Sequence, residues 1–173
     1  MYSIGDYVVY KRDVCKIVST KVVRELEYFV LESIDDTSLK ISVPKNSSAI
    51  RPVASKQECN NLINSIPSID VISVSDKKIE IEYKKLLNSG SLKDLVKIIK
   101  TTYLRNKKRL DGHKKIGETD DSYFNKAEKL LYNELSISLG LTYDDTKKYI
   151  KEAVENLIKE WEGKYERSLC IWT

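Results

Sequence analysis

The hydrophobic periodicity of this 173-residue chain changes once, close to Pro52. Before that proline, apolar, β-branched and aromatic residues recur at every second position, as a half-buried strand requires. After it, apolar residues recur at steps of three and four, as in an amphipathic helix. The sequence therefore predicts an α+β protein with a β module at 1–52 and an all-helical module at 55–173.

The β module is expected to contain short antiparallel strands. Its apolar residues fall into four groups, separated by polar or charged breaks at 11–13, 24–27 and 35–38. Breaks at these spacings suit hairpins joined into a small closed barrel rather than β-α-β units. The four groups lie at 8–10, 15–17, 28–31 and 39–43.

Helix starts in the second module are marked by a hydroxyl and an acidic residue three positions apart. Such a pair lets the hydroxyl cap the helix while the carboxylate returns a hydrogen bond. Another helix is expected to begin near Thr119, because Asp120 and Asp121 would place negative charge in its first turn. Gly90 and Gly140 are suited to ending the preceding helices. The capping pairs are Ser55 with Glu58, Ser91 with Asp94, and Thr142 with Asp145.

The last predicted helix has apolar residues at strict four-residue spacing. Tyr149, Ala153, Leu157 and Trp161 share one face, which is expected to pack inward. The other tryptophan, Trp172, lies in the C-terminal tail, and the sequence leaves both docking and exposure open for it.

Several protein classes are excluded or disfavoured. No apolar run approaches the roughly 18 residues that a membrane span needs, and the N-terminal charges follow the apolar stretch, unlike those of a signal peptide. We therefore expect a cytoplasmic protein without a membrane partner. The chain contains no phosphate-loop, dinucleotide-binding or hydrolase motif, and its three adjacent acid pairs point their side chains apart. No catalytic residue, cofactor or small-molecule substrate is expected.

Cysteine and histidine usage gives no sign of a metal site. Cys15, Cys59 and Cys170 are far apart, without a C-x-x-C motif, and the single His113 lies in a basic loop. We expect reduced cysteines with packing or surface roles. One disulfide plus one free thiol stays open as the alternative for an oxidising compartment.

Positive charge is concentrated in the middle of the chain. Residues 77–115 contain 13 Lys or Arg and four Asp or Glu, a formal charge of +9 in a chain of net charge +4. On the helix expected from Ser91, lysines form a stripe beside the apolar face. Cations at this density neutralise phosphates and release counterions, which favours nucleic-acid binding; a solvated helix face is the alternative. The stripe consists of Lys93, Lys97, Lys100, Lys107 and Lys108.

Several short motifs occur in a specific order. They are Gly5-Asp6, Val8-Val9-Tyr10, Tyr28-Phe29-Val30-Leu31, Ile41-Ser42-Val43-Pro44, Ile50-Arg51, Ser89-Gly90, Val96-x-Ile98-Ile99 and Ala127-Glu128-x-Leu130-Leu131-x-x-Glu134-Leu135. Their order resembles the CarD/CdnL family of bacterial transcription regulators, which bind RNA polymerase. The resemblance covers most of the chain.

This resemblance implies a two-domain regulator that tunes the open promoter complex. A Tudor-like or SH3-like β barrel would bind the β subunit of RNA polymerase, and the helical domain would bind promoter DNA near the upstream edge of the bubble. A monomer is the default expectation. The polymerase-binding candidates are Lys21, Arg24, Lys40, Ser42 and Arg51. The DNA-binding candidates are Ile79, Lys84, Lys85, Lys97, Lys100, Arg105, Lys107, Lys108, Arg109, Lys114 and Lys115.

The sequence departs from the family at both expected contacts. Lys11-Arg12-Asp13 replaces a turn containing Pro and Gly, so the first hairpin must be built differently. A polymerase-contacting arginine of the family falls on Ser42, although Lys40 lies on the same strand face. The family's minor-groove tryptophan aligns with Ile79, which is either an apolar wedge or a buried helix residue. A second hypothesis therefore keeps the polymerase contact but lets the helical module bind another protein or itself.

Overall fold

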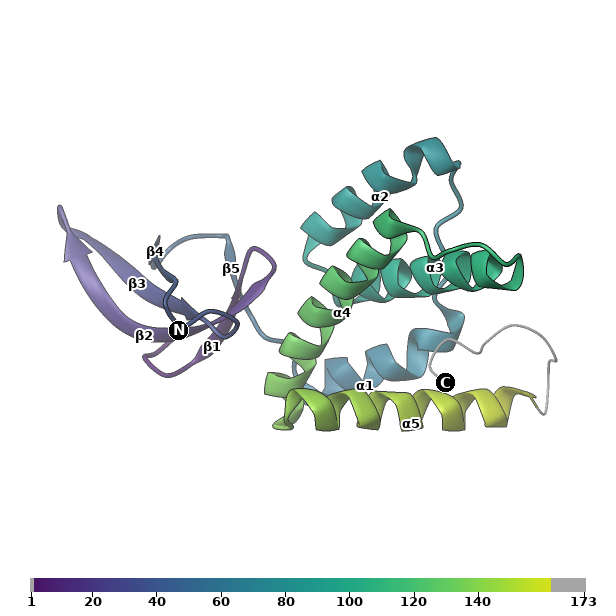
Figure 1. The fold of residues 1–173 in the computed structure, drawn as a ribbon. Helices are drawn as coiled ribbons and strands as arrows, with labels where there is room; N and C mark the ends of the chain where they lie inside the picture. Colours follow the sequence, from purple (N-terminus) through teal and green to yellow (C-terminus); the bar gives the residue numbers. More distant parts are fainter. Residues whose placement is uncertain (1, 163–173) are drawn as a thin grey trace. The chain divides into compact units, whose positions relative to one another are not determined.

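A computed structural model of the protein describes the backbone of residues 2–162 and the side chains of residues 2–157. The chain divides into two compact units, Met1–Ala54 and Ser55–Thr173. The described elements of the first unit are strands and those of the second are helices (Figure 1). The α+β class is therefore confirmed.

The first unit is a five-stranded antiparallel sheet. Its strands are β1 (Tyr7–Tyr10), β2 (Asp13–Val23), β3 (Leu26–Ser33), β4 (Lys40–Pro44) and β5 (Ile50–Pro52). They lie in the order β4-β3-β2-β1-β5, and the two edges, β4 and β5, do not pair with each other within residues 2–162. The sheet is therefore open, and the expectation of a closed barrel is wrong. Each edge strand ends in a proline, which has no backbone N–H to donate to a further strand.

The turns between strands use non-glycine residues in the left-handed region. Lys11 has φ 60° in the turn that joins β1 to β2, and its backbone N–H donates to the carbonyl of Ala49 at 2.9 Å. Arg24 and Glu25 have φ 48° and 66° at the tip of the β2–β3 hairpin. Two positive φ values in a two-residue loop match the twist of the flanking strands. The first hairpin is thus closed without Pro or Gly.

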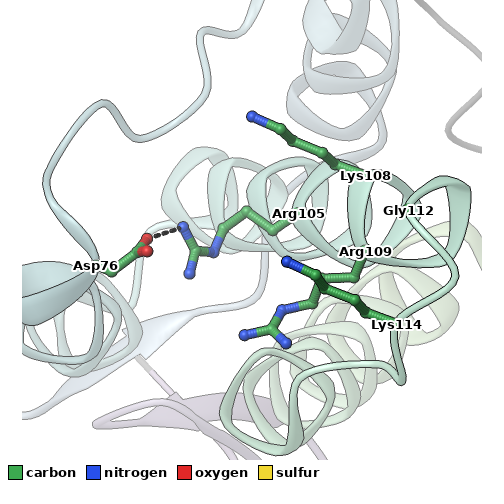
Figure 2. A pocket seen from close by; sticks show the side chains of 6 residues that line it. All are labelled: Asp76, Arg105, Lys108, Arg109, Gly112 and Lys114. Carbon is green, nitrogen blue, oxygen red and sulfur yellow. Dashed lines mark hydrogen bonds and ion pairs between the residues drawn. The ribbon is translucent and has the colours of Figure 1, made fainter.

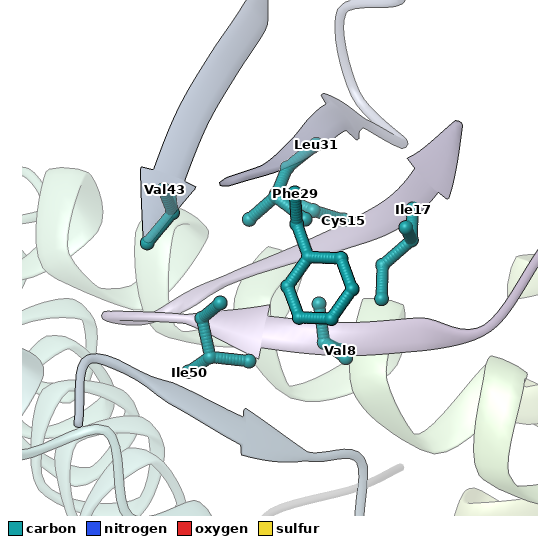
Figure 3. Packing of buried hydrophobic residues seen from close by; sticks show 7 residues of the cluster. All are labelled: Val8, Cys15, Ile17, Phe29, Leu31, Val43 and Ile50. Carbon is teal, nitrogen blue, oxygen red and sulfur yellow. The ribbon is translucent and has the colours of Figure 1, made fainter. Parts of the chain in front are cut away.

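One face of the sheet carries a hydrophobic cluster (Figure 3). Its buried members are Val8, Cys15, Ile17, Phe29, Leu31, Val43 and Ile50. The Tyr2 ring lies edge-on to Phe29, with 6.3 Å between the ring centroids. Burial, together with the Asp13 and Asp35 carboxylates, raises the pKa of the Cys15 thiol to about 11. Cys15 is therefore a packing residue that stays protonated at neutral pH.

The second unit is a helical bundle. Its elements are α1 (Lys56–Ser65), the short 3-10 helix η1 (Ile66–Ser68), α2 (Asp76–Ser89), α3 (Leu92–Asp111), α4 (Glu118–Leu139) and α5 (Tyr143–Glu162). α4 contacts α1, α2, α3 and α5, so it is the central helix of the bundle (Figure 1). Cys59 of α1 is also a free thiol and fully buried, whereas Cys170 lies outside the described residues.

Two of the three expected capping pairs form hydrogen bonds at their helix starts. The Glu58 N–H donates to Ser55 Oγ at 3.2 Å, and the Ser55 N–H donates to Glu58 Oε2 at 2.7 Å. The Asp145 N–H likewise donates to Thr142 Oγ1 at 3.1 Å.

The third pair is different. Ser91 precedes α3, but its side chain makes no capping hydrogen bond. The Asp94 carboxylate instead accepts a 2.7 Å hydrogen bond from the hydroxyl of Ser89. Gly90 and Gly140 both have φ 70° directly after α2 and α4, as the ends of those helices require.

The buried face of α5 is shifted by one residue from the expected one. Ile150 and Val154 are fully buried, whereas Tyr149 is 43% exposed. The four-residue spacing describes both faces equally well, and contact with α1, η1 and α4 selects the one that carries Ile150. The side chains of Trp161 and Trp172 lie outside the described part of the chain.

Candidate nucleic-acid interface

The predicted DNA-binding residues include one lysine that points into the bundle. Lys100 is 4% exposed, and its ammonium group donates hydrogen bonds to the carbonyls of Ile66, Pro67 and Ile69. Burial lowers the pKa of this lysine. Lys100 therefore satisfies the carbonyls in and after η1 and is not available to a phosphate. Its assignment to DNA binding is wrong. The predicted lysine stripe is interrupted at this position.

Ile79 is also internal. It is 6% exposed and lies on the buried side of α2 with Tyr83 and Leu87. Of the two interpretations, the structure supports the buried helix residue and contradicts the apolar wedge. The isoleucine that α2 does expose is Ile81, at 67%.

Arg105 links three helices through two carboxylates. Its Nη1 donates to Asp76 Oδ1 of α2 at 2.8 Å, and its Nε lies 3.1 Å from both oxygens of Asp120 in α4. The Asp120 carboxylate, 4% exposed, also accepts a 2.8 Å hydrogen bond from the Tyr83 hydroxyl. The negative charge of this buried carboxylate is therefore paired with the Arg105 guanidinium, and the Tyr83 hydroxyl donates a further hydrogen bond to it. Arg105 is a structural residue as well as a surface cation.

A cationic pocket lies beside this network. It has a volume of about 490 Å³ and is formed by the start of α2, the end of α3 and the following loop. Figure 2 shows its basic side chains extending to the side on which Asp76 lies. Four cations and one carboxylate therefore surround one hollow. The lining residues are Asp76, Arg105, Lys108, Arg109, Gly112 and Lys114.

The loop after α3 folds back and brings Lys114 to the pocket. The Lys114 N–H donates to the carbonyl of Arg109 at 2.8 Å, and the Gly117 N–H donates to Asn106 Oδ1, also at 2.8 Å. His113, directly before Lys114, has a left-handed φ of 55°. These hydrogen bonds thus hold the loop against the end of α3, so that a helix cation and a loop cation line the same pocket.

Three of the pocket cations form no ion pair with a carboxylate of the described residues. No carboxylate among residues 2–157 lies within ion-pair distance of Lys108, Arg109 or Lys114. The pKa of Asp76 is lowered first by its hydrogen bond to Arg105 and further by the charges of Arg109 and Lys108. The pocket therefore favours negative charge at the place where the Asp76 carboxylate lies.

The remaining DNA-binding candidates are not gathered at the pocket. Lys84 and Lys85 are exposed on α2 and pair with Glu80 and Glu82 at 2.9 and 3.6 Å. Lys97 is half-buried, whereas Lys107 and Lys115 are exposed beside the pocket residues in sequence without lining it. Sequence reasoning missed Asp76, because its acidic charge gave no sign that it faces the basic residues.

Four of the five polymerase-binding candidates share one face of the sheet. Val30 of β3 pairs with Ser42, Glu32 with Lys40, and Tyr28 with Lys21. These positions alternate with the buried Phe29 and Leu31, so they lie on the face opposite the hydrophobic cluster. Arg51 pairs with Val9 on that same face, whereas Arg24 is at the hairpin tip.

Other kinds of site receive no support from the described residues. Nowhere in that part of the chain do three His, Cys, Asp or Glu side chains come close enough together to hold a metal ion. None of the helices within residues 2–162 has the length and apolar character needed to cross a membrane. Comparison with known proteins adds no assignment: no protein-family model matches the chain, and no curated protein matches it.

Proposed function

We propose that this protein is a non-enzymatic transcription regulator that binds the backbone of promoter DNA with its helical unit and the β subunit of RNA polymerase with its sheet. The observation that carries the DNA half is the cationic pocket, where Arg105, Lys108, Arg109 and Lys114 face one hollow. Guanidinium and ammonium groups are the side chains that bind phosphate most strongly. Such contacts are independent of base sequence and sensitive to salt.

A polymer of phosphates fits this region better than one isolated phosphate. Lys107 and Lys115 are exposed next to pocket residues in the chain, so basic charge continues beyond the pocket. A nucleic-acid strand, which carries a phosphate at every nucleotide, can use both sets of cations. With Ile79 buried, no base wedge is proposed at that position.

The polymerase half is supported by the resemblance to CarD/CdnL proteins and by the common face of Lys21, Lys40, Ser42 and Arg51. A protein that holds polymerase and DNA together can shift promoter opening only if it binds the open state better. A difference of about 1 to 3 kcal/mol would change the open fraction substantially. Tuning of the open complex needs no catalytic group.

The DNA half is tested by removing three pocket cations at once. Replacing Lys108, Arg109 and Lys114 by Gln should weaken binding to a fluorescently labelled fork-junction DNA at least about tenfold at low salt. The slope of log affinity against log salt should become shallower by about two. Fluorescence anisotropy over a salt series measures both quantities.

The matched control removes the same charge elsewhere in the helical unit. Lys56, Lys126 and Lys148 are exposed and lie outside the pocket, so their replacement by Gln should change affinity much less. Equal losses of DNA affinity in the two triple variants would show that binding depends on net charge and not on the pocket. Unchanged affinity in the pocket variant would refute it, and sedimentation of the same sample would then test self-association instead.

The polymerase half is tested with the full chain in a pull-down of the isolated β subunit. Changing Lys21 and Lys40 together to Glu reverses two charges on the proposed face and should abolish retention. Changing Lys56 and Lys148 to Glu is the control and should leave retention unchanged. Retention by the first variant at the wild-type level would remove this half of the proposal.

A further inference from the structure

The cationic pocket already contains one anion, the carboxylate of Asp76. Its Oδ1 accepts a 2.8 Å hydrogen bond from Arg105 Nη1, drawn as a dashed line in Figure 2. We infer that Asp76 is a built-in competitor for phosphate at this pocket, which occupies Arg105 until a nucleic-acid phosphate displaces it. This inference rests on the proposed DNA function and adds a residue that tunes its affinity.

The two carboxylates on Arg105 are not equivalent. The Asp120 side chain is 4% exposed and holds the Nε side of the guanidinium with help from Tyr83. The Asp76 side chain is 87% exposed and holds only Nη1. An ion pair with one partner this exposed is screened by solvent and contributes little to stability. Asp76 can therefore leave while Asp120 keeps Arg105 in place.

The position of Asp76 is the one that a phosphate oxygen would take. Besides Arg105, the charges of Arg109 and Lys108 also lower the pKa of this carboxylate, so three cations act on the same point. Exchange of a carboxylate for a phosphate keeps a charge-assisted hydrogen bond on Nη1. It also removes from the pocket the acidic group found among its described lining residues.

Displacement of Asp76 requires no movement of α3. Asp76 is the first residue of α2, and Ser75 before it makes no side-chain capping bond. The Asp76 side chain is 87% exposed, so it can change rotamer without displacing packed neighbours. The exchange is thus confined to the edge of the pocket.

The test is the substitution Asp76→Asn in the full chain. Asparagine removes the charge but keeps an oxygen that can accept from Arg105. We expect the variant to bind labelled fork-junction DNA about three to ten times more tightly at low salt, with a salt slope steeper by up to about one. Fluorescence anisotropy at several salt concentrations measures both.

Asp144→Asn is the matched control. Asp144 is also exposed and in the first turn of its helix, α5, and no residue of α5 up to Leu157 lines the pocket. The two variants have the same net charge, and the control should bind DNA within about twofold of the wild type. Unchanged or weaker binding by the Asp76 variant, or an equal gain in the control, would overturn the inference.

The triple Gln variant of Lys108, Arg109 and Lys114 separates the two possible failures. If that variant loses affinity while Asp76→Asn gains none, the competitor role is wrong and the DNA function stands. If the triple variant keeps full affinity, both the DNA function and the competitor role of Asp76 are refuted. Asp76→Ser, which also removes the carboxylate, should reproduce the gain and shows that the effect belongs to the lost carboxylate. Circular dichroism confirms that each variant is folded.

Discussion

Lys100 and Lys108 lie about two turns apart on α3, and their ammonium groups meet opposite surroundings. Lys100 is 4% exposed and donates to three backbone carbonyls near η1. Lys108 is exposed and lines the cationic pocket. The same residue type on one helix thus stabilises the bundle at the first position and is available to a ligand at the second. Charge density along a sequence does not distinguish these two uses.

Arg105 lies between the two lysines and shares both surroundings. Its Nε meets the buried Asp120 carboxylate, whereas its Nη1 meets the exposed Asp76 carboxylate at the pocket. We therefore expect stability to depend most on the inward contacts and nucleic-acid affinity to depend on the outward ones. The following substitutions test this division, from the largest expected effect to the smallest.

Arg105→Met should give the largest loss of stability. It leaves the Asp120 carboxylate buried without its cation, which costs about 3 kcal/mol in the free energy of unfolding. Urea denaturation followed by circular dichroism measures the loss. Arg109→Met, four residues later on the exposed side of α3, should change stability by less than about 0.5 kcal/mol. Similar losses of unfolding free energy in both variants would contradict the separation between inward, stabilising contacts and outward, ligand-binding ones.

Lys100→Met should destabilise by about 2 kcal/mol, because three carbonyls near η1 lose a donor while the aliphatic volume is retained. The same urea titration applies. Lys108→Met is the control, with little effect on stability and a measurable loss of DNA affinity. If Lys100→Met weakened DNA binding in a fully folded protein, the inward role of Lys100 would be contradicted.

Tyr83→Phe should have the smallest effect, about 1 kcal/mol at neutral pH, because one hydrogen bond to Asp120 is lost. Burial and the Asp120 carboxylate raise the pKa of Tyr83. Above pH about 10 the unfolded chain loses this proton while the folded chain keeps it, so the wild type loses stability as pH rises.

The phenylalanine variant lacks the titrating hydroxyl of Tyr83, so its stability should fall less steeply than that of the wild type between about pH 10 and 11. Thermal denaturation across this pH range tests the difference. Tyr149→Phe is the control, since Tyr149 is 43% exposed. It should leave the alkaline slope as it is in the wild type. An identical slope in Tyr83→Phe would show that the buried hydroxyl does not contribute.

Local features of the fold could be predicted from the sequence. Ser55 with Glu58 marked the start of α1, and Gly90 and Gly140 marked the ends of α2 and α4. These signals work because a cap or a left-handed glycine acts through hydrogen bonds and φ values within a few residues. The same holds for the alternating apolar residues of β1 to β4.

Features that depend on neighbours across the fold were predicted less well. The sheet stays open because β4 and β5 do not pair within residues 2–162. The inward face of α5 carries Ile150 rather than Tyr149. In both cases the sequence pattern allowed two arrangements. For α5, contact with α1, η1 and α4 selects the face that is buried.

The sequence by itself determined the change from strands to helices near Pro52 and the concentration of basic residues in 77–115. It also marked the helix starts after Ser55, Ser91 and Thr142 and the helix ends at Gly90 and Gly140. Only the tertiary structure decided that Lys100 turns inward, that Lys114 meets Arg109, and that Asp76 faces them both across the pocket. The reason is physical. Backbone conformation follows from interactions over a few residues, whereas the accessibility of a charge depends on which distant segments fold against it.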